Sequence, residues 1–227
     1  MRAFETEKTE VAEIDRSVYD IKDKVNAAFE VNSGLTAEIV EQISKEKHDP
    51  DWMREFRLKA LDIYNKASIP NWGPSLEGLD MRNIVTYVRP NTEMRGKWSE
   101  VPDDIKNTFE RLGIPQAERS SLAGVGAQYD SEVVYHNVKE EVAAQGVVYT
   151  DMESALTGPY ADMVKEHFMK CVPPTDHKFA ALHGAVWSGG SFVYVPAGVH
   201  VDIPLQSYFR LNAPGAGQFE HTLIIVD

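Results

Sequence analysis

Apolar residues recur at helical spacing in the first part of the chain. Between residues 36 and 64 they return every three or four positions in two stretches, which predicts two helices. Thr36 is a suitable N-cap for the first helix, and Asp49 followed by Pro50 predicts the start of the second, with proline at its first position. The second helix presents one apolar stripe that is expected to be core: Trp52, Met53, Phe56, Ala60, Ile63 and Tyr64.

Further helices are predicted up to about residue 176. Pro102 would begin one with two acids at its positive end, Gly113 would end it, and Pro115 would begin another. Residues 130–145 also read as a helix, because valines repeat there at four-residue spacing: Val134, Val138 and Val142. The segment Pro70–Pro74 excludes a helix and predicts a hinge. Residues 35–176 are therefore expected to form a mainly helical domain.

The pattern changes after Lys178, where lysine no longer occurs and charged residues become rare. Runs of β-branched and aromatic residues, bounded by glycine, proline or asparagine, predict five short strands. They are residues 185–187, 191–195, 199–203, 207–211 and 221–226. Strands at such intervals suit a sandwich, a barrel or a stacked β-solenoid, and the spacing does not choose among these.

The last run, Leu223–Val226, is strongly apolar and is followed only by Asp227. An uncovered hydrophobic strand edge pairs readily with another chain. We therefore expect either self-association through this edge or a longer protein whose next strands pack there, and we favour the longer protein.

Composition limits the classes of function. The hydrophobic fraction of 43% and the charged fraction of 26% predict a packed core, whereas residues 1–34 are expected to be a charged, loosely ordered leader. The net charge of -12 argues against nucleic acid and anionic lipid as partners. A single cysteine, Cys171, forms no internal disulfide, and no apolar run is long enough to span a membrane. The expected location is the cytoplasm.

Three short motifs offer chemistry, each with a plainer alternative. Gly124 and Gly126 begin a dinucleotide fingerprint, but Tyr129 replaces its third glycine, so a flexible linker is preferred. His200 follows a proline–glycine turn much as in a cupin metal motif, which suggests a small metal-dependent β-barrel enzyme as the alternative function. Its spacing is one residue short, so a half-exposed strand residue is preferred. Cys171 is expected to be a small buried hydrophobe.

Arg210 and Asn212 lie two residues apart in the predicted strand 208–212, so both side chains would share one face. Either they point into a β interior, where the arginine needs a partner, or they lie outward on a solvated face. Alternation by itself leaves these two arrangements open.

Longer segments resemble the SufB family, the scaffold subunits of the SUF machinery for iron-sulfur cluster assembly. The resemblance runs from about Leu35 to Asp227. In chain order the matching segments are Pro70–Pro74, Asp103–Pro115, Ala127–Tyr135, Trp187–Pro196, Gly198–Leu205, Tyr208–Asn212 and Gly217–Glu220. Long matches in the family's order are more specific than any single short motif.

The resemblance implies an α+β fold, in which a helical domain over residues 35–176 leads into the first rungs of a right-handed parallel β-helix over residues 177–227. It also implies a complex with the SufC ATPase and the paralogue SufD. The scaffold would accept sulfur from a cysteine desulfurase system, and build and transfer a nascent cluster. It would not itself be an enzyme, because ATP hydrolysis belongs to SufC.

Carried over by position, the family's sulfur-path arginine and asparagine match Arg210 and Asn212, which favours the inward arrangement. The chain ends at about half the family's usual length, before the family's cluster-site residues and SufC-binding domain. We therefore expect the iron-sulfur cluster in the full-length complex and none on these residues, and only a structural share of the function here. Cys171 lies outside the matching segments, and neither Cys171 nor His200 is predicted to be a metal ligand.

Overall fold

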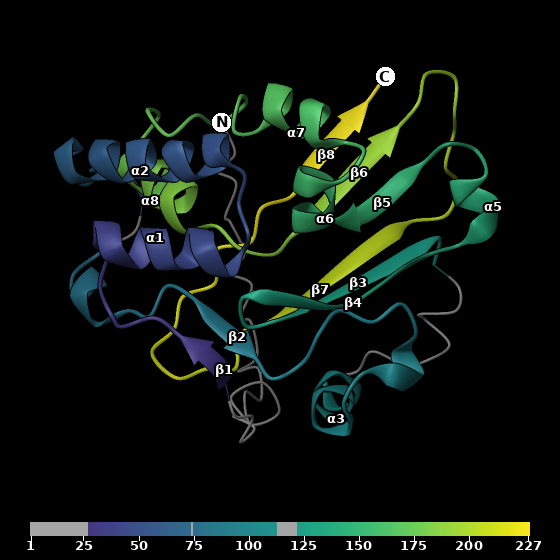
Figure 1. Cartoon of the computed structure of the whole chain (residues 1–227), viewed down its shortest axis with the longest axis horizontal. Coiled ribbons are helices and arrows are strands. Elements are labelled where there is room, and N and C mark those ends of the chain that lie inside the picture. The colour runs from purple at the N-terminus through teal and green to yellow at the C-terminus, as the bar shows by residue number, and fades with distance from the viewer. Residues whose placement is uncertain (1–26, 74, 113–121) are drawn as a thin grey trace, which may run out of the picture.

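The computed structural model describes residues 27–73, 75–112 and 122–227. Three helices make one layer: α1 (Ala37–Glu46), α2 (Asp51–Lys66) and α8 (Lys178–Val186). Beside this layer lie a two-stranded antiparallel sheet of β1 (Ala27–Glu30) and β2 (Val88–Pro90), and two three-stranded sheets (Figure 1). The helical layer is therefore built from both early and late segments of the chain.

The first two helices begin almost where the sequence predicts. Thr36 caps α1, its Oγ1 accepting a hydrogen bond from the Ile39 amide at 3.3 Å, which confirms that prediction. In α2, Pro50 occupies the cap position and Asp51 is the first helical residue, so the predicted start is wrong by one residue. Asp49 does not cap this helix, because its carboxylate pairs with the fully buried Arg57 instead.

The first three-stranded sheet contains β3 (Gly124–Tyr129), β4 (Glu132–Val138) and β7 (Leu205–Arg210). The central strand β3 runs antiparallel to β4 and parallel to β7. The second sheet contains β5 (Val148–Asp151), β6 (Ser191–Val195) and β8 (Leu223–Val226). Its central strand β6 runs antiparallel to β5 and parallel to β8.

Successive strands near the C-terminal end alternate between the two sheets. The chain leaves β6, forms β7 in the other sheet, and comes back as β8 beside β6, with Phe192 opposite Leu223. Figure 1 shows the sheets as neighbouring layers, and Tyr149 Oη lies 2.7 Å from Ser207 Oγ between them. A right-handed parallel β-helix stays a prediction.

Of the five strands predicted after Lys178, those at 191–195, 207–211 and 221–226 are confirmed, with small shifts of their ends. Residues 185–187 are not a strand, because they end helix α8, which is buried along most of its length. Residues 199–203 contain no strand either, and they connect β6 to β7. Short apolar runs do not distinguish a buried helix from a strand, so packing decides.

The predicted helix over residues 130–145 is wrong. Residues 132–138 form strand β4, and only α5 (Glu140–Ala143) is helical. The valine repeat was misleading because every fourth residue also lies on one face of a strand.

Residues 124–129 are not a flexible linker but the fully buried strand β3. Gly124 is needed there because a Cβ on it would lie 2.5 Å from Tyr149 Cδ1.

Residues 27–34, expected to be loosely ordered, include strand β1 and the buried Val31, so that expectation is wrong for them. Residues 1–26 lie outside the described residues. The segment 35–176 contains helices but also supplies β3, β4 and β5, so strands from both sides of residue 176 share the two sheets. The division at 176 stays a prediction.

Further short helices connect these layers: α3 (Asp103–Arg111), α6 (Met152–Thr157) and α7 (Ala161–His167). The predicted start of α3 after Pro102 is confirmed, and Ile105 and Phe109 are buried. Its predicted end at Gly113, and the helix after Pro115, lie outside the described residues. Within the described ranges no helix is both long and apolar enough to cross a membrane.

Candidate functional site

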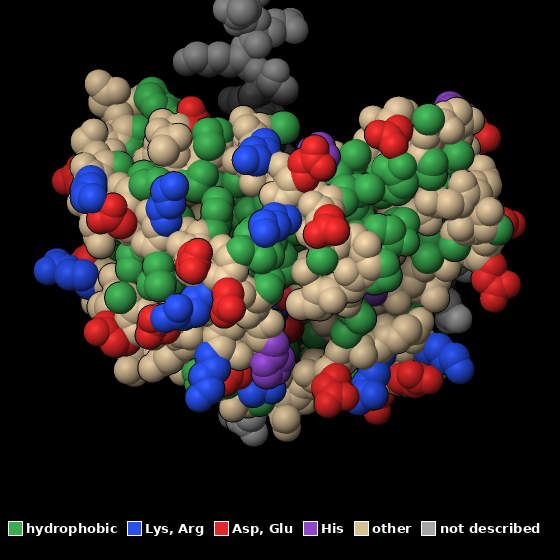
Figure 2. Space-filling view, turned by 45° about the horizontal axis from the view of Figure 1, so that its top comes forward, with side chains coloured by type: hydrophobic (Ala, Val, Ile, Leu, Met, Phe, Trp, Pro, Cys, Tyr) green, Lys and Arg blue, Asp and Glu red, His purple; other side chains and the backbone are tan. Residues whose placement is uncertain are grey.

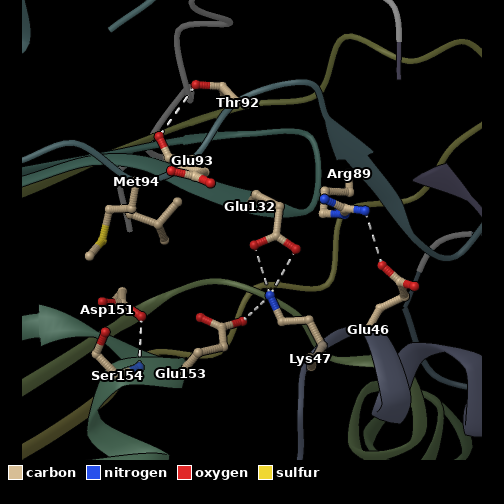
Figure 3. A pocket seen from close by; sticks show the side chains of 11 residues that line it. Glu46, Lys47, Arg89, Thr92, Glu93, Met94, Glu132, Asp151, Glu153 and Ser154 are labelled. Atoms are coloured by element: carbon tan, nitrogen blue, oxygen red, sulfur yellow. Dashed lines mark hydrogen bonds and ion pairs between the residues drawn. The ribbon is translucent and has the colours of Figure 1, made fainter. Parts of the chain in front are cut away.

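A cavity of about 310 Å³ opens where α1, β2, β4 and α6 meet (Figure 3). Its lining is strongly charged. Lys47 and Arg89 supply the cations, and the carboxylates come from Glu46, Glu93, Glu132, Asp151 and Glu153. These residues come from α1, β2, β4, β5 and α6 and from their connecting loops, so only the folded chain assembles them.

Lys47 occupies the C-cap position of α1 and points between two carboxylates, as Figure 3 shows. Its side chain is 3% exposed, and its Nζ lies 2.9 Å from both carboxylate oxygens of Glu132 and 2.6 Å from Glu153 Oε1. The Tyr87 hydroxyl donates to Glu132, and the Gly189 amide donates to Glu153 Oε1 at 2.6 Å. One ammonium therefore joins α1 to β4 and α6.

The pKa shifts in this cluster show which side chains are held in their charged form. Burial lowers the pKa of Lys47, but the charges of Glu153 and Glu132 outweigh it, so the net pKa is raised. For Glu153, burial raises the pKa, but the Lys47 charge and hydrogen bonds lower it overall. Burial, followed by the charge of Glu153, raises the pKa of Asp151. Lys47 is therefore held as an ammonium, and its chemistry is that of an ionic clamp rather than of a nucleophile.

Nothing in the sequence pointed to Lys47. Glu132 lies 85 residues away along the chain, and although it falls in the matching segment Ala127–Tyr135, that match does not indicate a contact with Lys47. The sequence shows only that Lys47 follows an amphipathic helix by one residue. Solvent-exposed lysines occupy that position just as readily, so the position does not indicate burial.

Only one of the two predicted sulfur-path residues lies within the strand. Arg210 is the last residue of β7, opposite Tyr129 of β3, and is partly buried. Asn212 lies beyond the end of the strand and is 3% exposed. Strand alternation does not extend to Asn212, so the predicted strand 208–212 is wrong at its end. The Asn212 amide instead donates to Asp130 Oδ1 at 2.6 Å, and this contact sets its position.

His200 and Cys171 are both exposed. His200 lies outside any strand, and its Nε2 is 2.9 Å from Asp202 Oδ1, with both side chains 85% exposed. The prediction of a half-exposed strand residue is therefore wrong, and this geometry gives the cupin alternative no support. Cys171 is not the buried hydrophobe that was expected. The described residues contain no cluster of three or more His, Cys, Asp or Glu side chains able to hold a metal.

Cys171 lines a second cavity, of about 500 Å³, together with His183 and His221. The two imidazoles are joined by a hydrogen bond of 2.8 Å between His183 Nε2 and His221 Nδ1. Burial, then the charge of Arg57, lowers the pKa of His183 to about 4. Burial, then His183, lowers the pKa of His221 to about 3. At neutral pH both rings are uncharged.

Beside this cavity, β8 leaves one edge unpaired by the described strands. Ile224 is 61% exposed and Val226 is 68% exposed. Figure 2, in which the top of Figure 1 comes forward, shows broad areas of hydrophobic side chains among charged ones. Self-association through this edge stays a prediction.

Comparison with known proteins decides the family. Residues 37–207 match the family described as the SufBD protein N-terminal region. The chain belongs to the SufBD family. It is 54% identical over 209 residues to the iron-sulfur cluster assembly protein SufB of Bacillus subtilis, a match covering 92% of this chain and 45% of that protein.

Two further SufBD relatives give the same result. An iron-sulfur cluster assembly SufBD family protein of Mycobacterium bovis is 49% identical over 223 residues, or 98% of this chain and 26% of that protein. One of Staphylococcus haemolyticus is 50% identical over 209 residues, or 92% of this chain and 45% of that protein. The chain thus spans less than half the length of these relatives. The predicted family is confirmed.

Proposed function

We propose that this SufBD protein acts in iron-sulfur cluster assembly as a non-catalytic scaffold. The observation that carries the proposal is the 54% identity, over 92% of the chain, to a protein named as an iron-sulfur cluster assembly protein. Identity at this level preserves the fold and most of the core. The cluster is the product that the scaffold builds and transfers, and its ligands would come from residues beyond the matched region.

The partners are part of the same proposal. A SufBD scaffold would work with SufD as a paralogous subunit, with SufC as the ATPase and with a cysteine desulfurase system as the sulfur source. The described residues would contribute the helical layer and the first coil of a parallel β-helix. The path from β6 through β7 to β8 supports this assignment, because parallel pairing after one passage through the other sheet is how such a coil repeats.

Arg210 and Asn212 are the proposed sulfur-path residues. A guanidinium donates several charge-assisted hydrogen bonds to an anion, and an amide adds a neutral donor. A persulfide or sulfide anion is the kind of species that these donors would stabilise. Arg210 is the only lysine or arginine in residues 179–227, and it lies at the end of β7.

The test uses the gene at its natural length in a host that depends on it for iron-sulfur enzymes. Arg210→Met is expected to lower the activity of an iron-sulfur enzyme such as aconitase about tenfold, the scale of losing one charged hydrogen bond. Arg82→Met is the matched control, because Arg82 is 89% exposed and pairs with Asp80 only two residues away. Normal enzyme activity with Arg210→Met at unchanged protein abundance would remove Arg210 from the path.

A further inference from the structure

Asp130 lies in the tight turn between β3 and β4, next to the end of β7. It is 5% exposed, and its φ of 50° is in the left-handed region, which aspartate tolerates better than most residues. The register places its neighbour Tyr129 opposite Arg210. The turn thus lies directly beside the segment that carries both proposed sulfur-path residues.

Asp130 binds the backbone of that segment at three points. Its amide donates to the Arg210 carbonyl at 2.8 Å. Its Oδ1 accepts from the Asn212 amide at 2.6 Å and from the Ala213 amide at 2.8 Å. Because β7 ends at Arg210, the amides of Asn212 and Ala213 lie beyond the hydrogen bonds that pair β7 with β3. The Asp130 carboxylate is their acceptor instead.

Two glutamines extend the arrangement into the other sheet. The Asp130 carbonyl accepts from Gln128 Nε2 at 3.0 Å and from Gln218 Nε2 at 3.2 Å. Gln128 is 1% exposed, and its Oε1 accepts from the Gly190 amide at 2.8 Å, just before β6. Asp130 therefore belongs to a buried polar network that fixes the turn before β6 and the chain after β7 relative to each other.

We propose that Asp130 is a positioning residue for the sulfur path, holding the backbone of residues 210–213 so that Arg210 and Asn212 present their donors in one fixed arrangement. The inference rests on the proposed function of those two residues. A carboxylate that accepts two backbone amides restricts a loop more strongly than neutral hydrogen bonds do. Within a sulfur path, a misplacement of about 1 Å is enough to reduce transfer strongly.

The experiment compares Asp130→Gly with Asp130→Asn. Glycine adopts the positive φ freely and removes the acceptor, whereas asparagine keeps both an acceptor oxygen and the turn. In the 227-residue chain, Asp130→Gly is expected to accelerate hydrogen exchange of the Asn212 and Ala213 amides about tenfold or more, measured by NMR. Asp130→Asn is expected to accelerate it much less, and the β6 amides are expected to keep their protection in both variants.

The same variants are then assayed in the dependent host at natural length. Asp130→Gly is expected to lower aconitase activity nearly as much as Arg210→Met, and Asp130→Asn is expected to restore most of it. Asp80→Gly is the matched control, because Asp80 also accepts a backbone amide, that of Arg82 at 3.0 Å, and its carboxylate binds Arg82 and Asn83 rather than residues 210–213. It is expected to change neither the activity nor the exchange of the two amides.

Each outcome separates the two proposals. If Arg210→Met leaves aconitase activity intact, the sulfur-path role fails, and the positioning role fails with it. If Arg210→Met lowers activity while Asp130→Gly exposes the two amides without lowering activity, only the positioning role is overturned. Unchanged amide exchange in Asp130→Gly overturns it as well. Should that variant not fold, exchange in the unsubstituted chain still tests the proposal, because the Asn212 and Ala213 amides that bind Asp130 Oδ1 are expected to be protected, and a lack of protection at both would overturn it.

Discussion

Arg57 is the buried cation that holds the helical layer together. Its side chain and that of Asp49 are both 0% exposed, and Arg57 Nε lies 2.6 Å from Asp49 Oδ2. Arg57 also donates to the Trp187 carbonyl at 2.8 Å, just after α8, and its guanidinium lies 4.7 Å from the Trp187 ring centroid. It therefore fixes α2 to the end of α8 and to the loop before α2.

Replacing Arg57 with methionine keeps the apolar stem and removes every one of these hydrogen bonds. The Asp49 carboxylate would then be buried without a counter-charge, a change that costs about 3–5 kcal/mol. Domains of this size are stable by only about 5–15 kcal/mol. We therefore expect Arg57→Met to lose about 3–5 kcal/mol of the free energy of unfolding, a large share of the total.

Urea denaturation followed by tryptophan fluorescence measures this loss, because Trp187 is fully buried. Arg54→Met is the matched control on the same helix, since Arg54 and its partner Glu41 are both 49% exposed, and such pairs contribute at most about 1 kcal/mol. Adding Asp49→Leu to Arg57→Met is expected to recover part of the loss. A loss below about 1 kcal/mol for Arg57→Met would refute the reasoning.

Three further predictions follow from buried groups. Burial lowers the pKa of His183 to about 4 and that of His221 to about 3, so these rings take up protons at a higher pH in the unfolded chain than in the folded one. The free energy of unfolding should therefore decrease as the pH is lowered from 6.5. The slope approaches about 1.4 kcal/mol per pH unit for each ring, measured by urea titration at several pH values. Lys47→Met leaves two carboxylates uncompensated and should cost about 3–5 kcal/mol in the same assay. Gly124→Ala forces its new Cβ against a buried tyrosine and should lower stability by about 1–3 kcal/mol, with a lower Tm.

These predictions have controls in the chain itself. Gly96→Ala should be nearly neutral, because a Cβ there meets nothing within 4 Å. Lys97→Met should also be nearly neutral, since that side chain is 78% exposed. For the pH dependence, His221→Phe should flatten the slope between pH 4 and 6.5. Equal losses for Gly124→Ala and Gly96→Ala, or an unchanged pH slope in His221→Phe, would contradict the packing and titration arguments.

Sequence signals predicted the structure correctly where residues close together in the chain determine it. The Thr36 cap, the helix after Pro102 and the strands at 191–195 and 223–226 depend on neighbouring residues, and the structure confirms them. The family, too, was evident from long ordered segments, and the match over residues 37–207 confirms it. These features are encoded within short windows, which propensity and spacing describe well.

Sequence signals failed where two structures share one pattern. The valine repeat after residue 130 fits a helix and a strand equally, and pairing with β3 made it strand β4. The run at residues 185–187 suits a strand, but packing against α2 made it the end of α8. In each case the hydrophobic pattern correctly indicated burial, and the partner that covers the apolar face chose the backbone conformation.

The sequence by itself determined the family, the early helices and the change from charged to β-rich composition after Lys178. Only the tertiary structure decided the ionic and polar contacts. Lys47 meets Glu132 across 85 residues of chain, and Asp130 meets Asn212 across 82. Contacts at such separation leave no periodic trace, because each requires one residue from each of two distant segments. Their energy depends on burial and geometry that exist only after the chain has folded.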